Sequence, residues 1–123
     1  MAAAIFQTST ARFREAGQPY LSARRVADGL GVTLTELAAL AGIAPNILTA
    51  KSEARKVDNA LSPVVRILAI VAEMAGDDDR ATAWFKHQPI PGWAGKTGFD
   101  LVREGKAEKV LLYLEAVRTG VYA

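Results

Sequence analysis

The sequence predicts an all-α protein, and three observations support this. No segment of its 123 residues alternates between apolar and polar positions, as a half-buried strand would. Apolar residues recur instead every three or four positions. The segments that carry them begin at Ser, Thr, Asp or Pro and end at Gly, which are the usual start and stop signals of helices. A chain of this length forms one domain, or two small lobes that share a core.

The N-terminal part begins with a segment unlike the helices that follow. Residues 1–20 are rich in alanine and then polar, so we expect an arm or a loosely docked helix. Residues 21–30 have helical spacing, and Gly29 and Gly31 mark the end of that helix.

Two short helices are expected next. Thr33 and Glu36 form a capping box, in which the hydroxyl accepts from the third helical amide and the carboxylate reaches back to the cap amide. They predict a helix over residues 34–41. Pro45 suits the first turn of a helix, so we expect a second helix over residues 45–52.

The middle of the chain contains the most apolar segment. Residues 53–60 are charged and expected to form a turn, and Ser62-Pro63 is expected to start the next helix. That helix, residues 64–75, is apolar nearly all round, which is typical of a core helix. The acidic run 77–79 is interpreted as the N-terminal cap of the following helix, because its spacing is not that of a calcium loop.

The C-terminal part is expected to place three helices around one loop. The loop has two prolines and three glycines. In order, we expect a helix with Trp84 and Phe85 that ends near His87, a loop over residues 88–98, a short helix over residues 99–102, and a last helix over residues 106–119 that ends at Gly120.

Composition and motifs argue against an enzyme. The absence of cysteine excludes disulfides, thiolate metal sites and cysteine nucleophiles, and one histidine cannot form a two-histidine metal site. Gly95-Lys96-Thr97 resembles the end of a phosphate-binding loop, but Ile90 stands where that motif needs glycine, and no strand precedes it. We expect no catalytic residue, no metal and no cofactor. A hydrolase or transferase that uses His87 with nearby carboxylates is kept as an alternative.

Charge and hydropathy favour a cytoplasmic protein with an anionic partner. The net charge of +2 arises in residues 1–60, which have 7 basic and 5 acidic residues, whereas the remainder has 8 of each. This is a small bias towards polyanions. The longest strongly apolar run, residues 67–72, is far below the ~20 residues that cross a bilayer. The first residues lack the basic region of a secretory signal.

Residues 35–48 resemble the helix-turn-helix of Xre/Cro-type repressors. Ala38 is small where the two helices cross, and Gly42 allows the positive φ of the turn. Three apolar residues would fill the space between the helices: Leu37, Ile43 and Leu48. An ordinary pair of helices without a DNA role is the alternative.

The resemblance implies a Cro/Xre-like domain over residues 21–75, with operator DNA as its partner. The start of the second helix would meet base edges, and the cations after it would meet phosphates. The expected DNA-binding residues are Thr33, Thr35, Pro45, Asn46, Thr49, Lys51, Arg55 and Lys56. Leu34 stands where such repressors often have glutamine, and Lys51 where they are normally apolar. These departures favour DNA binding that is weak alone or depends on dimers.

The second half resembles the toxin-binding domain of Xre/MbcA/ParS-type antitoxins. It has the family's tryptophan helix at Trp84, the Gly-Lys-Thr loop at residues 95–97, and a last helix that ends in Gly-Val-Tyr at residues 120–122. Gly98 replaces the usual proline after Thr97, which predicts a looser first turn in the short helix.

The order of the two halves also matches this family over residues 21–123. It implies a toxin-binding domain over residues 76–123 that continues from the helix-turn-helix domain, and it leaves only the arm, residues 1–20, uncovered.

This resemblance implies an antitoxin with two functions. Such antitoxins bind RES-domain toxins, which consume or transfer ADP-ribose from NAD⁺, and cover the NAD⁺ pocket with their C-terminal end. Their helix-turn-helix represses the operon. The implied partners are a RES-domain toxin, operator DNA and a second copy in a homodimer. The implied toxin-binding residues are Trp84, Trp93, Lys96, Val121 and Tyr122.

Several alternatives stay open. Lys96 would brace its own loop by bonding carbonyls instead of the toxin, and Tyr122 would fold back on its own chain. The second functional hypothesis is a plain dimeric transcriptional regulator without a toxin. Its C-terminal half would bury Trp93 and the Val121-Tyr122 tail in its own symmetric interface.

Overall fold

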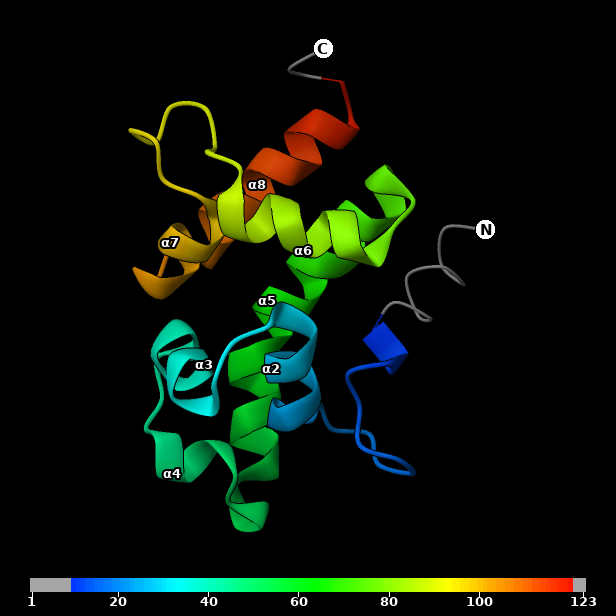
Figure 1. Ribbon diagram of the computed structural model, residues 1–123, viewed down its shortest axis with the longest axis vertical. Coiled ribbons are helices and arrows are strands. Elements are labelled where there is room, and N and C mark those ends of the chain that lie inside the picture. Colours follow the sequence, from blue (N-terminus) through cyan, green and yellow to red (C-terminus); the bar gives the residue numbers. More distant parts are fainter. Residues whose placement is uncertain (1–9, 121–123) are drawn as a thin grey trace.

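The structure is a computed structural model that describes residues 10–120, and its named elements are all helices (Figure 1). In chain order they are α2 (Ala23–Leu30), α3 (Leu34–Ala41), α4 (Pro45–Leu48), the 3₁₀ helix η1 (Lys51–Glu53), α5 (Ala54–Ala75), α6 (Asp78–His87), α7 (Gly98–Arg103) and α8 (Ala107–Arg118). Within the described range, β structure is limited to two isolated antiparallel bridges, Arg14 with Leu21 and Pro89 with Thr97. The prediction of an all-α fold is confirmed.

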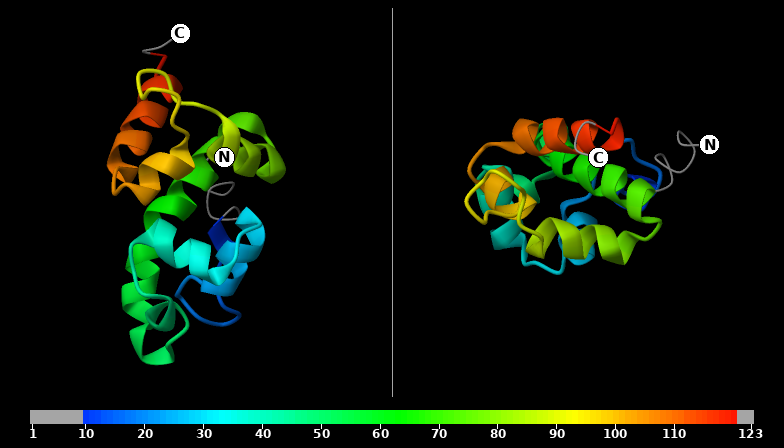
Figure 2. Two further views of the ribbon diagram at one scale, coloured as in Figure 1. Left: turned by 60° about the vertical axis from the view of Figure 1, so that its left-hand side comes forward. Right: turned by 90° about the horizontal axis from the view of Figure 1, so that it is seen from above.

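The long helix α5 connects the two halves of the molecule. Figure 1 shows α2, α3 and α4 around its first part and α6, α7 and α8 around its second part, and Figure 2 shows the same division in a turned view. One face of α5 is buried along its whole length, and its second half is buried nearly all round. Its buried residues are Val57, Leu61, Val64, Val65, Ile67, Leu68, Ala69, Ile70, Val71 and Ala72.

The start of α5 corrects two expectations. Residues 53–60, expected to be a turn, are mostly helical, and Pro63 lies inside the helix and not at its start. The reason is periodic burial: Val57, Leu61 and Val64 continue the core-facing stripe towards the N-terminus. Pro63 has no amide to donate to the Asn59 carbonyl, and the preceding Ser62 hydroxyl donates back to the Asp58 carbonyl at 2.7 Å.

The second short helix is also shorter than expected. In place of one helix over residues 45–52, α4 ends at Leu48, and η1 follows after Ala50, whose backbone is extended. Ala44 at the N-cap of α4 provides no side-chain acceptor, which leaves its first amides without the usual cap. The expected helix over residues 34–41 and its capping box are confirmed.

The described part of the expected arm is docked firmly. Phe13 is 2% exposed, and its ring lies against α2. A Cβ atom at Gly29 would come within 2.7 Å of Phe13 Cε1, so this glycine is required by packing inside α2. Gly29 therefore does not end the helix; Gly31, with a φ of 68°, is its C-cap.

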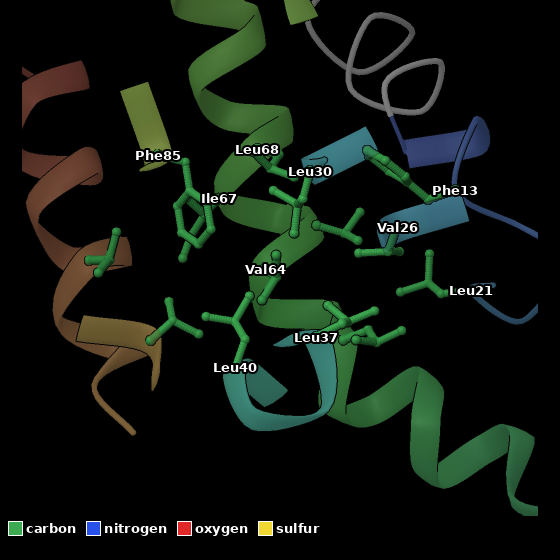
Figure 3. Packing of buried hydrophobic residues seen from close by; sticks show 14 of the residues in the cluster. Phe13, Leu21, Val26, Leu30, Leu37, Leu40, Val64, Ile67, Leu68 and Phe85 are labelled. Carbon is green, nitrogen blue, oxygen red and sulfur yellow. The ribbon is translucent and has the colours of Figure 1, made fainter. Parts of the chain in front are cut away.

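A single hydrophobic core spans both halves. Figure 3 shows Leu30, Leu37 and Leu40 converging with Ile67 and Phe85 on one interior. Polar contacts join the halves as well. Lys86 Nζ donates to the Leu30 carbonyl at 2.9 Å, and the Thr82 hydroxyl donates to the Gly29 carbonyl at 3.4 Å. The C-terminal carbonyls of α2 are thus held by side chains of α6.

Among the described residues, no single helix has the length and apolar character that crossing a bilayer requires. The segments Lys51–Ala75 and Asp78–His87 reach that length and apolar character only when taken together, and they are bent by 119° relative to each other.

Candidate functional site

The loop between α6 and α7 has a defined shape although it has no regular structure. Ile90 anchors it from inside, at 2% exposure. The Ile90 amide donates to the Lys96 carbonyl at 2.8 Å, and the Lys96 amide donates to the Trp93 carbonyl at 3.0 Å. The bridge between Pro89 and Thr97 closes the loop at its base. Residues 89–97, called the tryptophan loop below, therefore present Trp93 from a preformed scaffold.

The tip of the tryptophan loop holds an unusual backbone conformation. Ala94 has a φ of 55° and is the only non-glycine residue with positive φ in the described part of the chain. It lies between Gly92 and Gly95, whose φ angles are 86° and 82°. An alanine in this region costs on the order of 1 kcal/mol, which the surrounding hydrogen bonds must offset. Backbone of this kind concentrates at binding sites.

Three charged side chains brace the tryptophan loop: Lys96 within the loop, and Glu104 and Lys106 beside it. Lys96 Nζ lies 2.8 Å from Glu104 at the end of α7, and Lys106 Nζ lies 3.4 Å from the same carboxylate. Lys106 Nζ also lies 5.5 Å from the centre of the Trp93 ring. The hydrogen bond from Lys96, with a further one from Lys106, lowers the pKa of Glu104 below its ordinary value. Lys96 thus braces its loop through the Glu104 carboxylate.

The first turn of α7 is capped and tightly packed. The Thr97 hydroxyl accepts from the Asp100 amide at 3.1 Å, and Asp100 Oδ2 accepts from the Thr97 amide at 3.0 Å. A Cβ atom at Gly98 would lie 3.0 Å from Phe85 Cδ1, so the glycine brings α7 close to α6. The expected loosening of this turn by Gly98 is wrong, because the capping box and Phe85 fix it.

An apolar patch lies between the end of α5, α6 and α8. Trp84 is half-buried, and together with Met74, Tyr113 and Val117 it lines a shallow cavity of about 220 Å³. Met74 and Leu112 are the large hydrophobic residues exposed within the described range, at 43% and 63%. Val121 and Tyr122 lie outside the described residues.

The residues expected to bind DNA are all exposed, but they do not form one cluster. Asn46 and Thr49 belong to α4 and its end, and Lys51, Arg55 and Lys56 follow along η1 and the first turn of α5. Thr33 and Thr35 lie at the other end of α3. Thr33 is occupied as the N-cap, since its hydroxyl accepts from the Glu36 amide at 3.1 Å. The Thr33 amide in turn donates to Glu36 Oε1 at 3.0 Å, and this hydrogen bond lowers the pKa of Glu36 below its ordinary value.

The remaining candidates for chemistry have structural roles. Asp77 caps α6 by accepting from the amides of Asp79 and Arg80, at 2.7 and 3.1 Å, as the acidic run predicted. His87 is exposed at the last position of α6. Within residues 10–120, no three His, Asp or Glu side chains are grouped so that they could hold a metal ion.

Residues 71–120 match the family model of the antitoxin Xre/MbcA/ParS C-terminal toxin-binding domain. The C-terminal part of the chain belongs to this family. The matched range runs from the end of α5 to the end of α8, so it includes the tryptophan loop, its charged brace and the apolar patch. The match supports a type II antitoxin with a toxin as its partner. Neither the comparison with curated proteins nor the comparison with solved structures gave a match.

The sequence pattern named Trp84, Trp93 and Lys96 as toxin-binding residues, which stays a prediction, and it did not single out Glu104 and Lys106. Each of these two charged residues looks like an ordinary solvated side chain in sequence, and their contact with the loop depends on how α7 turns into α8. The Gly105 between them, with a φ of 81°, was the available signal for that turn.

Proposed function

We propose that this antitoxin neutralises a RES-domain toxin by covering its NAD⁺ pocket, and that it also binds operator DNA to repress its own operon. The observation that carries the proposal is the family match over residues 71–120, a range that includes the tryptophan loop with its hydrogen bonds and ion pairs. A preformed surface loses little conformational entropy when a partner binds.

The toxin would meet the tryptophan loop first. Trp93 offers a large rigid ring, and the ammonium groups of Lys96 and Lys106 lie beside it. Aromatic side chains held in place by their own chain are frequent interface anchors. The family resemblance implies that the tail after Gly120 then reaches the NAD⁺ cleft of the toxin, where Tyr122 would fill the pocket. Trp84 would contribute from the apolar patch.

Truncation after Thr119 tests this part of the proposal. The buried residues of α8 end at Leu114, so the shortened protein should fold with an unchanged thermal midpoint. It should also bind DNA like the full chain. Cells that express the proposed RES-domain toxin together with the truncated protein should lose protection. Their NAD⁺ level should fall as it does without any antitoxin. A truncated protein that still protects fully would contradict a tail that blocks the active site.

Operator binding would use the end of the molecule formed by α4, η1 and the start of α5. Asn46 and Thr49 are exposed there for base edges, and Lys51, Arg55 and Lys56 for phosphates. Because α4 has only 4 residues, it offers fewer side chains to the major groove than an ordinary recognition helix. Such a short helix favours binding by a dimer, which would contact two half-sites of the operator. The antitoxin would act in the cytoplasm.

Two substitutions test operator binding. Asn46→Ala should cost ~1–3 kcal/mol on the cognate site and relax specificity there. Lys56→Ala should weaken all sequences alike and flatten the salt dependence. Unchanged operator affinity in both variants, measured by fluorescence anisotropy, would refute this part of the proposal.

A further inference from the structure

A groove of about 700 Å³ lies beside the proposed DNA-binding segment, and none of the expected DNA contacts accounts for its far side. Thr49 and Lys51 line it from the end of α4 and from η1, whereas Gln18 and Arg24 line it from the hairpin-like segment that precedes α2 and from α2 itself. These two segments are called the rims of the groove below. Apolar side chains, Leu21 among them, line it as well. The two rims come from parts of the chain that are about thirty residues apart in sequence.

Hydrogen bonds fix the segment that carries the far rim. The Glu15 amide donates to the Tyr20 carbonyl at 3.1 Å, and the Ser22 amide donates to the Phe13 carbonyl at 2.7 Å. The Leu21 amide donates to Asp58 Oδ1 of α5 at 2.8 Å. These bonds, with the buried Phe13 ring, hold residues 13–22 at a set distance from α5. We call residues 14–21 the N-terminal hairpin.

Each rim carries a cation without a carboxylate partner among residues 10–120. Arg24 on one rim and Lys51 on the other are exposed, and neither takes part in an ion pair within residues 10–120. Arg55 and Lys56 extend the positive charge along the first turn of α5. Glu15 is the acidic side chain that lines the groove. An anionic chain that crossed the groove would therefore meet a cation on each side.

We propose that the N-terminal hairpin and Arg24 form a second DNA-contacting element, with one sugar–phosphate strand crossing the mouth of the groove between Arg24 and Lys51. This rests on the operator binding proposed above. The fixed backbone of this segment matters, since it needs little reordering when Arg24 meets a phosphate. The element adds affinity and register without reading bases, which compensates for the short α4.

Salt-dependent binding of operator DNA tests the proposal directly. Arg24→Gln should reduce the slope of log K against log salt by about 0.9, which corresponds to roughly eightfold weaker binding at 0.1 M salt. Arg24→Lys should keep most of the slope. Arg103→Gln, an exposed arginine at the end of α7, is the matched control and should leave the slope unchanged. Circular dichroism melting of each variant checks that the fold is intact.

A second variant is expected to act in the opposite direction. Glu15→Gln removes the carboxylate on the groove, so it should strengthen operator binding at low salt and make the slope steeper. If the wild-type protein binds no DNA at all, both the proposed operator binding and this inference fail. If Lys56→Ala flattens the slope while Arg24→Gln and Glu15→Gln both behave like Arg103→Gln, operator binding stands and the inference is overturned.

Discussion

At the scale of single residues, the absence of a side chain at Gly29 leaves the space in which the Phe13 ring packs against α2. In an exposed helix, Gly→Ala stabilises by up to ~1 kcal/mol. Here the new Cβ would lie 2.7 Å from a ring that is 2% exposed. We therefore predict that Gly29→Ala destabilises the protein by about 1–3 kcal/mol in urea unfolding.

The double variant is the control for this prediction. Phe13→Leu with Gly29→Ala should recover part of the loss, because the smaller side chain leaves room for the methyl group. A single Gly29→Ala variant that is as stable as the wild type, or more so, would show that the ring is not held against α2.

At the scale of elements, the charged brace makes the tryptophan loop sensitive to acid. The folded pKa of Glu104 lies below its unfolded value, so the brace is present above the unfolded pKa and is lost as pH falls through the folded pKa. In a Trp84→Phe background, the fluorescence of Trp93 should change over that acidic range. Glu104→Gln should abolish the change, whereas Glu108→Gln on the exposed side of α8 should not. An identical transition in the Glu104→Gln variant would contradict the brace.

The elements differ in how far they could be predicted from sequence. Local signals were sufficient where a cap and a glycine bounded a helix, as for α3 with Thr33 and Gly42. They failed at Pro63, because proline is a good helix start in isolation and only the burial of Val57 and Leu61 shows that the helix begins earlier.

The candidate site was predicted only in part, and for a similar reason. The tryptophans and Lys96 follow from the family pattern in sequence. The contacts of Lys106 with Trp93 and of Arg24 with the groove depend on tertiary placement, which no local pattern encodes. The docking of Phe13 was missed because one aromatic residue in a polar segment carries no periodicity.

At the scale of the whole molecule, the apolar residues of α5 that could form a dimer interface are mostly buried inside the chain. The apolar stretch of α5 from Val64 to Ala72 is buried by the other helices apart from Arg66, which leaves Met74 and Leu112 as the large exposed hydrophobic residues among residues 10–120. The homodimer stays a prediction, now placed on the exposed side of α8 around Leu112.

Light scattering at tens of micromolar should therefore give a dimer mass for the wild type. Leu112→Glu should shift it to the monomer with no loss of helicity, since this side chain is 63% exposed. Arg103→Gln serves as the control and should stay dimeric. A strictly monomeric wild type would contradict the prediction.

Calorimetric titration of the purified chain into the proposed RES-domain toxin partner tests the central claim most directly. We expect saturable binding that is weakened about thirtyfold or more by Trp93→Ala, in keeping with an aromatic anchor worth ~2 kcal/mol or more. Lys56→Ala, at the far end of the molecule, should bind the toxin like the wild type. Absence of binding between two folded proteins, or equal loss in both variants, would contradict a toxin interface on the tryptophan loop.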